Sequence, residues 1–328
     1  AGEVPEGHRP FAIQQARSYF AHPARVRSRK EYRYDLAILV NPEEENPPSD
    51  EGALRRFRKA AHAAGIGTEL IGRDDYGRIA EFDALFIRET TAVNHHTYRF
   101  ARRAVMEGLV VLDHPESIIR CGNKVYQAEL FQRHDIPCPR TLVVHGGNVD
   151  DVAATVGLPC VLKKPDGSFS QGVRKVDEEG ELRRLLDELF RESELVVAQT
   201  FTPSPFDWRV GVLDRQVLYV CRYHMARGHW QIIRGRGDGV RYGRVEPVPE
   251  HAAPARAVEL GRRAASLVGD GLYGVDIKEV DGRFLVMEVN DNPNIEAGLE
   301  DAVPREALYD AVVEWFRRRL DARGGGAA

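Results

Sequence analysis

Three things are scarce in this 328-residue chain: long apolar runs, cysteines and net charge. No apolar run approaches the roughly 20 residues that cross a bilayer, and the first residues lack a signal-peptide core. The 46 basic and 50 acidic side chains leave a net charge of −4, so no overall field attracts nucleic acid or an anionic membrane. The four cysteines, at positions 121, 138, 160 and 221, lack metal-type spacing and are interpreted as reduced thiols. A cytoplasmic location is expected.

Apolar sequence is plentiful enough for a large core. Hydrophobic residues make up 43% of the chain, and this length predicts two or three domains. Residues 1–31 are basic and poor in apolar residues, which indicates a linker or N-terminal extension that an upstream domain could precede. Residues 32–115 alternate helices with four predicted strands and are typical of a small parallel α/β domain. These strands are expected at 35–40, 67–72, 83–89 and 109–113.

The rest of the sequence divides into two further regions and a tail. Region 116–195 contains two strands around a Gly/Ser-rich loop, and its helix 181–192 carries a leucine stripe that predicts burial on one side. Region 196–322 opens with an apolar strand and ends with a helix that starts at Pro304. The closing residues 323–328, RGGGAA, are expected to be a disordered tail.

An apolar strand at 284–290, FLVMEVN, carries two polar side chains, Glu288 and Asn290. A strand that is apolar on both faces is typical of full burial, where an ionised carboxylate is costly unless a positive group meets it. Side chains two apart share a face, so Glu288 and Asn290 point the same way. Asp276 in the preceding GVDIK strand joins them if the hairpin loop has three residues with Gly282 in the left-handed conformation, which we predict. A two-residue loop would put Asp276 on the other face.

Asp276, Glu288 and Asn290 would then offer three hard oxygen ligands on one surface. Such a set suits Mg²⁺ shared with phosphate oxygens. The alternative is a buried acid pair neutralised by arginine. We favour the metal, because no cation is expected beside this apolar hairpin.

Two lysines and a loop offer groups that can bind phosphate. The loop before strand 172–177 is rich in glycine and serine, so its backbone N–H groups can cover phosphates, and Lys163 ends the strand before it. Lys124 begins a helix capped by Asn123, and helix N-termini favour anions. Each signal is weak alone, since such loops and first-turn lysines are common. The loop residues concerned are Gly167, Ser168, Ser170 and Gly172.

The segment VVAQTFTPSPFDWR at 196–209 changes from a buried strand into a loop with two prolines. This pattern is typical of a hinge. An exposed main-chain edge at such a hinge can pair with adenine, and a nearby acid can bind the ribose hydroxyls. Asp207 and Arg209 share a face of the strand that follows.

In this order the motifs resemble those of ATP-grasp enzymes, and most closely the RimK-like ligases that join a carboxylate to an amine. The resemblance covers residues 32–320 and implies an ATP-grasp fold, in which an α/β, Rossmann-like pre-ATP-grasp domain precedes two α+β subdomains that grip ATP. The basic linker is similar to one that follows an extra N-terminal domain in some RimK-like proteins. The implied roles are phosphate binding for Lys124 and Lys163, adenine binding for Gln199, Thr200 and Phe201, ribose binding for Asp207, and binding of Mg²⁺, or Mn²⁺ in its place, for Asp276, Glu288 and Asn290.

One stretch departs from the family pattern. RimK-like ligases carry an Arg-x-Asn pair near the terminal phosphates, whereas this sequence has Gln231-Ile232-Ile233. Gln231 can donate hydrogen bonds but brings no charge. The charge must then come from other residues, for which Arg222, Arg234 and Arg236 are candidates unless they form a solvated basic edge. An arginine near the metal is expected to hold the substrate carboxylate and then the oxyanion, with Arg222 preferred and Arg209 second.

The predicted reaction forms an amide bond and releases ADP. Transfer of the γ-phosphoryl group to a substrate carboxylate gives an acyl phosphate, which an amine attacks. Phosphoryl transfer depends on positioning and charge neutralisation, and the sequence offers no Ser-His-Asp or Cys-His arrangement. The expected partners are an amine, such as an amino acid, and a peptide or small carboxylic acid. Candidate substrate contacts are Arg88, Asn292, Asn294 and Glu296.

Other interpretations stay open. His95 and His96 are either further substrate contacts or a helix-start feature, and no third ligand suggests zinc. Rival functions are a small-molecule kinase on the same scaffold, a non-catalytic ATP-binding regulatory module, and nucleic-acid binding by the basic, aromatic run 222–244. The near-neutral net charge disfavours nucleic acid. A homo-oligomer is compatible with the sequence, which does not identify the substrates.

Overall fold

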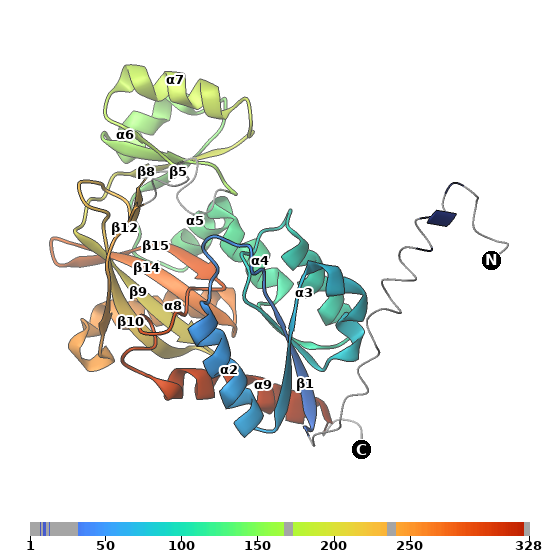
Figure 1. Ribbon diagram of the computed structural model, residues 1–328. Coiled ribbons are helices and arrows are strands. Elements are labelled where there is room, and N and C mark those ends of the chain that lie inside the picture. The colour runs from blue at the N-terminus through green and yellow to red at the C-terminus, as the bar shows by residue number, and fades with distance from the viewer. Residues whose placement is uncertain are drawn as a thin grey trace.

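The computed structural model describes residues 32–166, 173–234 and 241–324, with positions 7, 9, 10 and 13 near the N-terminus. Three sheets of four or five strands and one two-stranded ribbon make up its β-structure (Figure 1). Most of the predicted basic extension lies outside the described residues, as does Arg236. The predicted loop residues Gly167, Ser168, Ser170 and Gly172 lie outside them too.

The first sheet is parallel and has the strand order β2-β1-β3-β4. Its strands end at one edge, where an open α/β sheet generally binds ligands. The predicted alternation of strands and helices is confirmed, with strand ends shifted by one or two residues. The elements are β1 (Tyr34–Leu39), α2 (Glu51–Ala63), β2 (Ile66–Ile71), η2 (Arg73–Glu81), β3 (Ala84–Ile87), α3 (His96–Met106) and β4 (Val110–Leu112).

The second sheet is antiparallel and has the order β5-β8-β6-β7. Helices α6 and α7 cover it at the top of Figure 1, and the predicted leucine stripe of α7 is buried. The two helices α4 and α5 lead into this sheet. The elements are α4 (Pro115–Gly122), α5 (Lys124–Arg133), β5 (Thr141–Val144), η3 (Val149–Asp151), α6 (Val152–Val156), β6 (Cys160–Lys163), β7 (Arg174–Val176), α7 (Glu179–Leu189) and β8 (Val196–Thr200).

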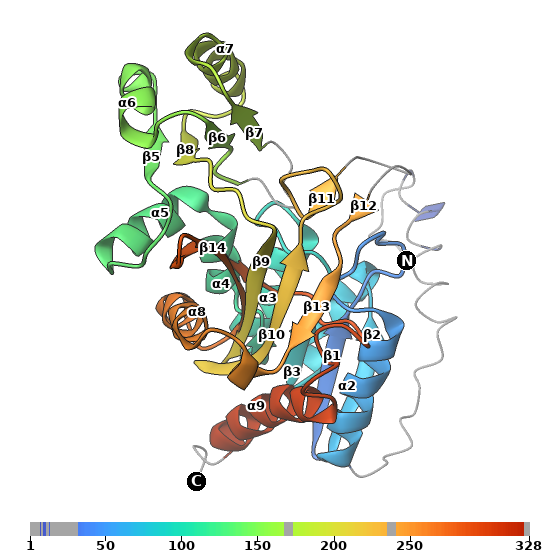
Figure 2. The ribbon, with the colours of Figure 1, turned by 90° about the vertical axis from the view of Figure 1, so that its left-hand side faces the viewer.

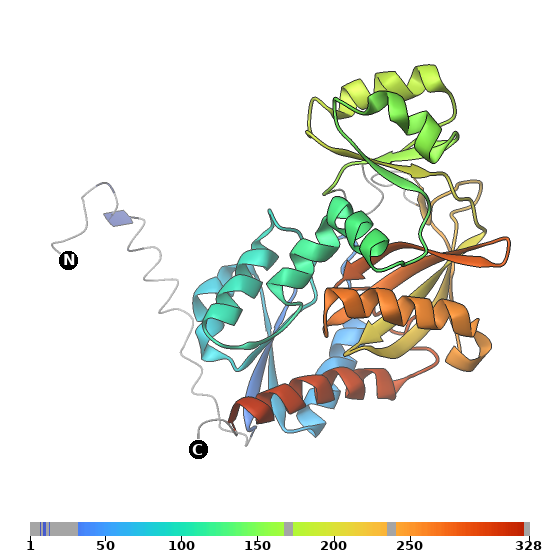
Figure 3. The same cartoon turned by 180° about the vertical axis from the view of Figure 1, so that it is seen from behind.

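The third sheet is antiparallel, with the order β13-β10-β9-β14-β15. Helix α8 covers one face of it (Figure 3), and the short ribbon β11-β12 extends from its end (Figure 2). The elements are β9 (Phe206–Leu213), β10 (Gln216–His224), β11 (Ile233–Arg234), β12 (Arg241–Tyr242), β13 (Val245–Val248), η5 (Glu250–Ala252), α8 (Ala255–Val268), β14 (Leu272–Val280), β15 (Arg283–Asp291) and α9 (Glu306–Gly324).

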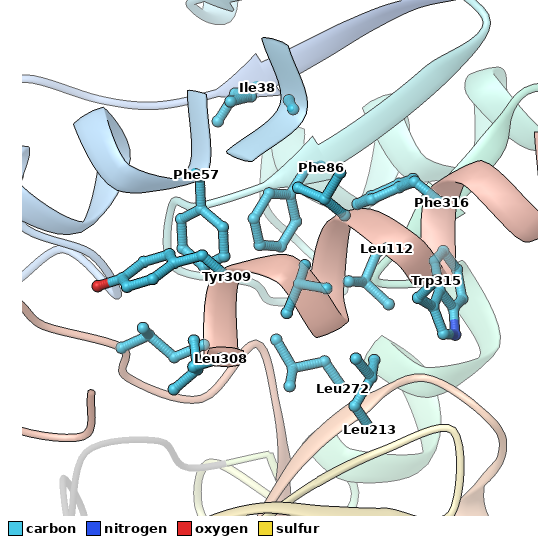
Figure 4. Packing of buried hydrophobic residues seen from close by; sticks show 14 of the residues in the cluster. Ile38, Phe57, Phe86, Leu112, Leu213, Leu272, Leu308, Tyr309, Trp315 and Phe316 are labelled. Atoms are coloured by element: carbon cyan, nitrogen blue, oxygen red, sulfur yellow. The ribbon is translucent and has the colours of Figure 1, made fainter. Parts of the chain in front are cut away.

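Helix α9 joins the first and third sheets through one hydrophobic core (Figure 4). Phe316 is fully buried and makes an edge-to-face contact with Phe86 of β3, with ring centroids 5.7 Å apart. Leu213 and Leu272 bring the third sheet into the same cluster. The predicted last helix is confirmed, although α9 starts at Glu306, two residues after Pro304. Its burial fixes the N-terminal sheet against the sheet that carries the predicted metal ligands.

Two predicted boundaries are wrong. Strand 195–201 was placed at the opening of the third region, but β8 pairs with β5 and β6 inside the second sheet, which moves the boundary past Thr200. The tail was predicted to begin at 323, but α9 continues to Gly324, and Arg323 donates a hydrogen bond to the Asp83 carbonyl at 3.2 Å. Residues 325–328 lie outside the described residues.

We expect Phe316→Ala to destabilise the protein by about 3–5 kcal/mol, because it leaves a cavity where α9 meets β3. Met106→Ala is a suitable control, since Met106 is 81% exposed at the end of α3, and such surface changes stay within about 0.5 kcal/mol. Urea unfolding of both variants measures the difference. Equal unfolding midpoints would contradict the role given to this core.

Candidate functional site

The hairpin β14-β15 brings Asp276, Glu288 and Asn290 onto one face, as predicted, but by a different route. Its loop is the two-residue turn Asp281-Gly282, with φ of +50° and +70°, so the predicted three-residue loop is wrong. Both positive φ values are typical of a type I′ turn. A β-bulge at Met287 shifts the register by one residue, and Asp276 therefore lies opposite Glu288.

Strand β15 is an edge strand, and most of its side chains are only partly buried, so the expectation of burial on both faces is wrong. The outer edge of β15 is covered by polar groups from Gln127 of α5 and from Pro137, which follows that helix. The Gln127 side chain accepts a hydrogen bond from the Val289 N–H at 2.8 Å and donates to the Val289 carbonyl at 3.0 Å. The Val286 N–H donates to the Pro137 carbonyl at 2.8 Å. These bonds fix α5, which begins at Lys124, beside the edge that carries Glu288.

Asp276 has an arginine partner, as the alternative of a buried acid neutralised by arginine foresaw, so the expectation that no cation lies beside this hairpin is wrong. Arg209 donates two hydrogen bonds to its carboxylate, at 2.6 and 2.9 Å, and both side chains are buried. The arginine crosses above Gly274, where an added Cβ would lie 3.0 Å from Arg209 Cδ. The Asn290 amide donates to Asp276 Oδ2 at 3.1 Å. Two carboxylates and an amide oxygen on one surface are the ligand types that Mg²⁺ prefers, so the residues present fit that ion.

A pocket that is partly open to solvent joins this surface to the second sheet. Lys124, Lys163, Gln199 and Glu288 all line it. Lys124 Nζ lies 3.7 Å from Glu288 Oε2, and Lys163 donates a hydrogen bond to Gln199 Oε1 at 2.8 Å. Residues predicted from four separate motifs thus share one pocket.

Burial and charge oppose each other in this pocket. Burial raises the pKa of Asp276 to about 6, although Arg209 opposes the rise. Burial would also raise the pKa of Glu288, but Lys124, Lys163 and Arg209 together bring it below its usual value. Burial lowers the pKa of Lys163 to about 8 against the opposing effect of Glu288. A ligand that adds negative charge beside the lysines would therefore stabilise their charged forms.

Lys278 of the GVDIK motif is a further residue of the site, for which the sequence predicted no role. It lies two residues after Asp276 on the same strand, which is the signal that places it on the same face. It is buried and donates to the Asp207 carboxylate at 2.6 Å and to Ser204 Oγ at 2.8 Å. Asp207, the predicted ribose contact, is thus held by a third lysine.

The hinge residues are not the exposed edge that the sequence suggested. The N–H of Thr200 donates to the Arg140 carbonyl at 2.9 Å, and the N–H of Phe201 donates to the Pro159 carbonyl at 3.1 Å. Both N–H groups are therefore already satisfied within the protein. The roles of Gln199, Thr200 and Phe201 at adenine stay predictions.

Arg222, the preferred catalytic arginine, lies on the wrong face of the third sheet. It pairs across the strands with Trp208, whereas its neighbour Cys221 pairs with Arg209. Since adjacent residues point to opposite faces, Arg222 lies on the α8 side, away from Asp276. There it forms an ion pair with Glu246 at 3.2 Å and stacks on the Trp208 ring at 4.7 Å. Arg209, the second choice, lies on the predicted metal face.

The stretch at Gln231 that departs from the family pattern lies near Phe201 of the hinge. The Gln231 carbonyl accepts a hydrogen bond from the Ala226 N–H at 2.9 Å, and the Trp230 ring makes an edge-to-face contact with Phe201. Arg234 belongs to the short strand β11. Phosphate binding by Gln231 or Arg234 stays a prediction.

Arg88, a predicted substrate contact, is committed to structure instead. It is 1% exposed and donates to Ser49 Oγ at 3.0 Å, to Asn292 Oδ1 at 2.7 Å and to the carbonyls of Pro48 and Pro293 at 2.5 and 2.9 Å. These four bonds join the loop after β1 to the loop after β15, so the prediction of a substrate contact is wrong for Arg88.

The other three predicted substrate contacts lie in the loop after β15. Asn292 is buried and donates to the Glu89 carbonyl at 2.7 Å, with φ of +44°, so it shapes the turn. Asn294 donates to Glu296 Oε1 at 3.2 Å, and both side chains are partly exposed. Substrate contact by Asn294 and Glu296 stays a prediction.

The sequence pattern of one protein family matches more than half of this chain. The match covers residues 121–303, and the family is described as a RimK-like ATP-grasp domain. The chain belongs to the RimK-like ATP-grasp family. The resemblance noted from the motifs is therefore confirmed, and the reaction class of this chain is ATP-dependent ligation of a carboxylate to an amine. ATP and Mg²⁺ are the cofactors typical of that family.

Individual relatives are similar at low identity. A probable alpha-L-glutamate ligase of Vibrio vulnificus is 25% identical over 232 residues, which cover 70% of this chain and 74% of the relative. An alpha-aminoadipate–LysW ligase, LysX, of Sulfolobus acidocaldarius is 28% identical over 280 residues, which cover 81% and 94%.

Solved structures support the ATP-grasp fold. A RimK domain protein of Sphaerobacter thermophilus has a TM-score of 0.63 at 16% identity and covers 85% of this chain and 98% of its own. A D-alanine–D-alanine ligase of Bacillus anthracis complexed with ATP has a TM-score of 0.64 at 16% identity, covering 88% and 99%.

Among the described residues, none of the helices combines the length and the apolar character needed to span a membrane.

Comparison of Arg209→Lys with Arg222→Lys tests which arginine serves the site. We expect the Arg209 variant to lower the rate of ADP formation by about 100-fold, because a misplaced Asp276 disturbs the geometry of the reacting groups. The Arg222 variant should stay within about threefold of the parent, as expected for a surface change away from the site. Thermal unfolding of both variants separates lost activity from lost fold. The reverse order of rates would contradict the assignment.

The lowered pKa of Lys163 predicts a pH dependence of ATP binding. A lysine with a pKa of about 8 is charged below that pH and loses its charge as the pH rises through it. The affinity of the parent for ATP should therefore fall above about pH 8, whereas Lys163→Arg should hold its affinity, since arginine stays charged. Lys164→Arg, which changes a lysine paired with Glu192, is the matched control. Identical pH profiles for all three proteins would refute this prediction.

Proposed function

We propose that this enzyme makes an acyl phosphate from ATP and a substrate carboxylate and then passes the acyl group to an amine. The observation that carries the proposal is the shared face of Asp276, Glu288 and Asn290 beside Lys124 and Lys163. Hard oxygen ligands next to lysines suit a metal-bound polyphosphate. The oxygen ligands would bind the metal ion, and the two lysines would bind the phosphates that the ion contacts.

The balance of charge around the pocket supports a polyanionic ligand. Four cationic side chains, Arg209, Lys124, Lys163 and Lys278, are coupled to three carboxylates, Asp207, Asp276 and Glu288. A divalent ion adds positive charge, which a nucleotide triphosphate offsets. Mg²⁺ held by Asp276, Glu288 and Asn290, with Mn²⁺ as a substitute, would neutralise charge on the phosphate oxygens when bound.

The roles of the protein side chains in this proposal follow from their contacts. Lys124 and Lys163 bind the phosphates and reduce the repulsion that opposes approach of a carboxylate. Arg209 orients Asp276 through its paired hydrogen bonds rather than touching the substrate. Lys278 holds Asp207 for the ribose. No protein nucleophile is required, because the substrate carboxylate accepts the phosphoryl group.

An amino acid is the proposed partner of a second, carboxylate-bearing substrate. The relatives from Vibrio vulnificus and Sulfolobus acidocaldarius are named for glutamate and for alpha-aminoadipate with LysW. These names support an amino acid as one substrate and leave a peptide or a small acid as the other. We place the enzyme in the cytoplasm, where ATP and Mg²⁺ are supplied.

Glu288→Gln tests the proposal. Loss of the carboxylate should abolish ADP formation and leave the fold intact, because Glu288 is only partly buried at a sheet edge. ADP release is measured against a panel of amines and acids, with mass spectrometry for the amide. Glu279→Gln on the neighbouring strand, whose carboxylate accepts from Trp208 Nε1 on the other face, is the control. Retained activity in Glu288→Gln would remove the metal assignment, and ADP with a phosphorylated product but no amide would indicate a kinase.

A further inference from the structure

A cluster of three metal-ligating side chains lies in the first domain, where β3 ends and α3 begins. Glu89 follows β3, and His95 and His96 stand at the start of α3. His96 Nε2 lies 2.9 Å from Glu89 Oε1 and 3.0 Å from Oε2, and His95 Nε2 lies 3.9 Å from Glu89 Oε1. One ligand atom of each residue lies within 4.8 Å of the other two. Glu89 is the third ligand that the sequence did not reveal.

The hydrogen bonds of His95 determine which nitrogen faces Glu89. Thr97 Oγ1 donates its one hydrogen to the Thr90 carbonyl at 3.2 Å. His95 Nδ1, 3.0 Å from that same oxygen, must then carry a proton and donate it. The Nε2 atom of neutral His95 therefore presents a lone pair toward the Glu89 carboxylate. A histidine whose second nitrogen is fixed in this way is typical of metal ligands.

The Glu89 carboxylate is incompletely satisfied. It is 1% exposed, and Oε1 has no hydrogen-bond partner among the described residues, although His96 Nε2 is near it. A buried carboxylate oxygen without a donor is costly. A lone pair of His95 facing that carboxylate adds to the cost. A cation between them would satisfy both groups.

We propose that Glu89, His95 and His96 bind a divalent transition-metal ion of the zinc type. Two imidazoles and one carboxylate form a known ligand set for Zn²⁺ that leaves one position open. Zinc bonds of about 2.0–2.1 Å at tetrahedral angles separate ligand atoms by about 3.3 Å, which lies between the 2.9 and 3.9 Å that separate Glu89 Oε1 from the two Nε2 atoms. Imidazole ligands favour zinc over Mg²⁺, which takes oxygen ligands. The His95 side chain is 39% exposed, so solvent reaches the cluster.

The charges around the cluster are mixed. Glu44 lies close by and accepts from the Thr90 N–H at 3.2 Å, while Arg73 and Arg99 add positive charge near the histidines. Burial lowers the pKa of both imidazoles.

The proposed ion lies next to the loop that follows the Mg²⁺ strand but uses none of its side chains. The Glu89 carbonyl accepts a hydrogen bond from Asn292 Nδ2 at 2.7 Å, and Thr91 Oγ1 donates to Asp291 Oδ2 at 2.7 Å. An ion bound to Glu89 would fix the β3–α3 loop against the end of β15. The site shares no side chain with the predicted nucleotide site, although it adjoins the predicted substrate side.

Zinc binding by the full chain, purified without a polyhistidine tag and stripped with chelator, tests the proposal. In excess Mg²⁺, calorimetry should detect one Zn²⁺ per chain, and Co²⁺ in its place should give visible absorption bands typical of a low-coordinate site. His95→Ala and His96→Ala should each weaken Zn²⁺ binding by about tenfold to 100-fold.

His251→Ala is the matched control, because His251 is exposed in η5, on another part of the chain. It should bind Zn²⁺ like the parent. Thermal unfolding without metal checks that the His95 variant, altered at an exposed side chain, keeps its fold. No stoichiometric Zn²⁺ binding in excess Mg²⁺, or binding that both cluster variants retain, would overturn the proposal.

Discussion

The negative charge of Asp276 and Glu288 must be balanced on a hairpin that is otherwise apolar. Arg209 supplies one counterion through two hydrogen bonds, and Lys124 lies beside the other carboxylate. Local features follow from this requirement. Gly274 leaves room for the arginine, and the β-bulge turns Glu288 to the same face as Asp276. An ion pair of this kind is costly to bury, which is consistent with a site that is completed by a ligand.

The fold brings the counterions to this hairpin from separate parts of the chain. Gln127 and Pro137 bind the outer edge of β15 and hold the start of α5, with Lys124, against it. The second sheet carries Lys163 over the same pocket. Helix α9 and the first domain pack against the third sheet through a shared core. Arg88 fixes the loop that follows β15. Positions far apart in sequence thus determine one small volume.

The sequence predicted most elements and the shared pocket, because strand periodicity and motif order carry that information. Where it failed, the missing information was tertiary. The two-residue turn was misread since nothing in the sequence marks a bulge at Met287, and the face of Arg222 depends on the register of β9 with β10. The edge position of β15 depends on strand order. Lys278 could have been found from its spacing to Asp276, but the burial of Arg88 could not.

The central claim is that Asp276, Glu288 and Asn290 share one divalent ion with a nucleotide. Anomalous diffraction from crystals grown with Mn²⁺ and a non-hydrolysable ATP analogue measures this directly. The account predicts one manganese peak about 2.0–2.3 Å from an oxygen of each of the three side chains and in contact with phosphate oxygens. Asp276 bound only to Arg209, with the manganese peak elsewhere on the nucleotide, would contradict it.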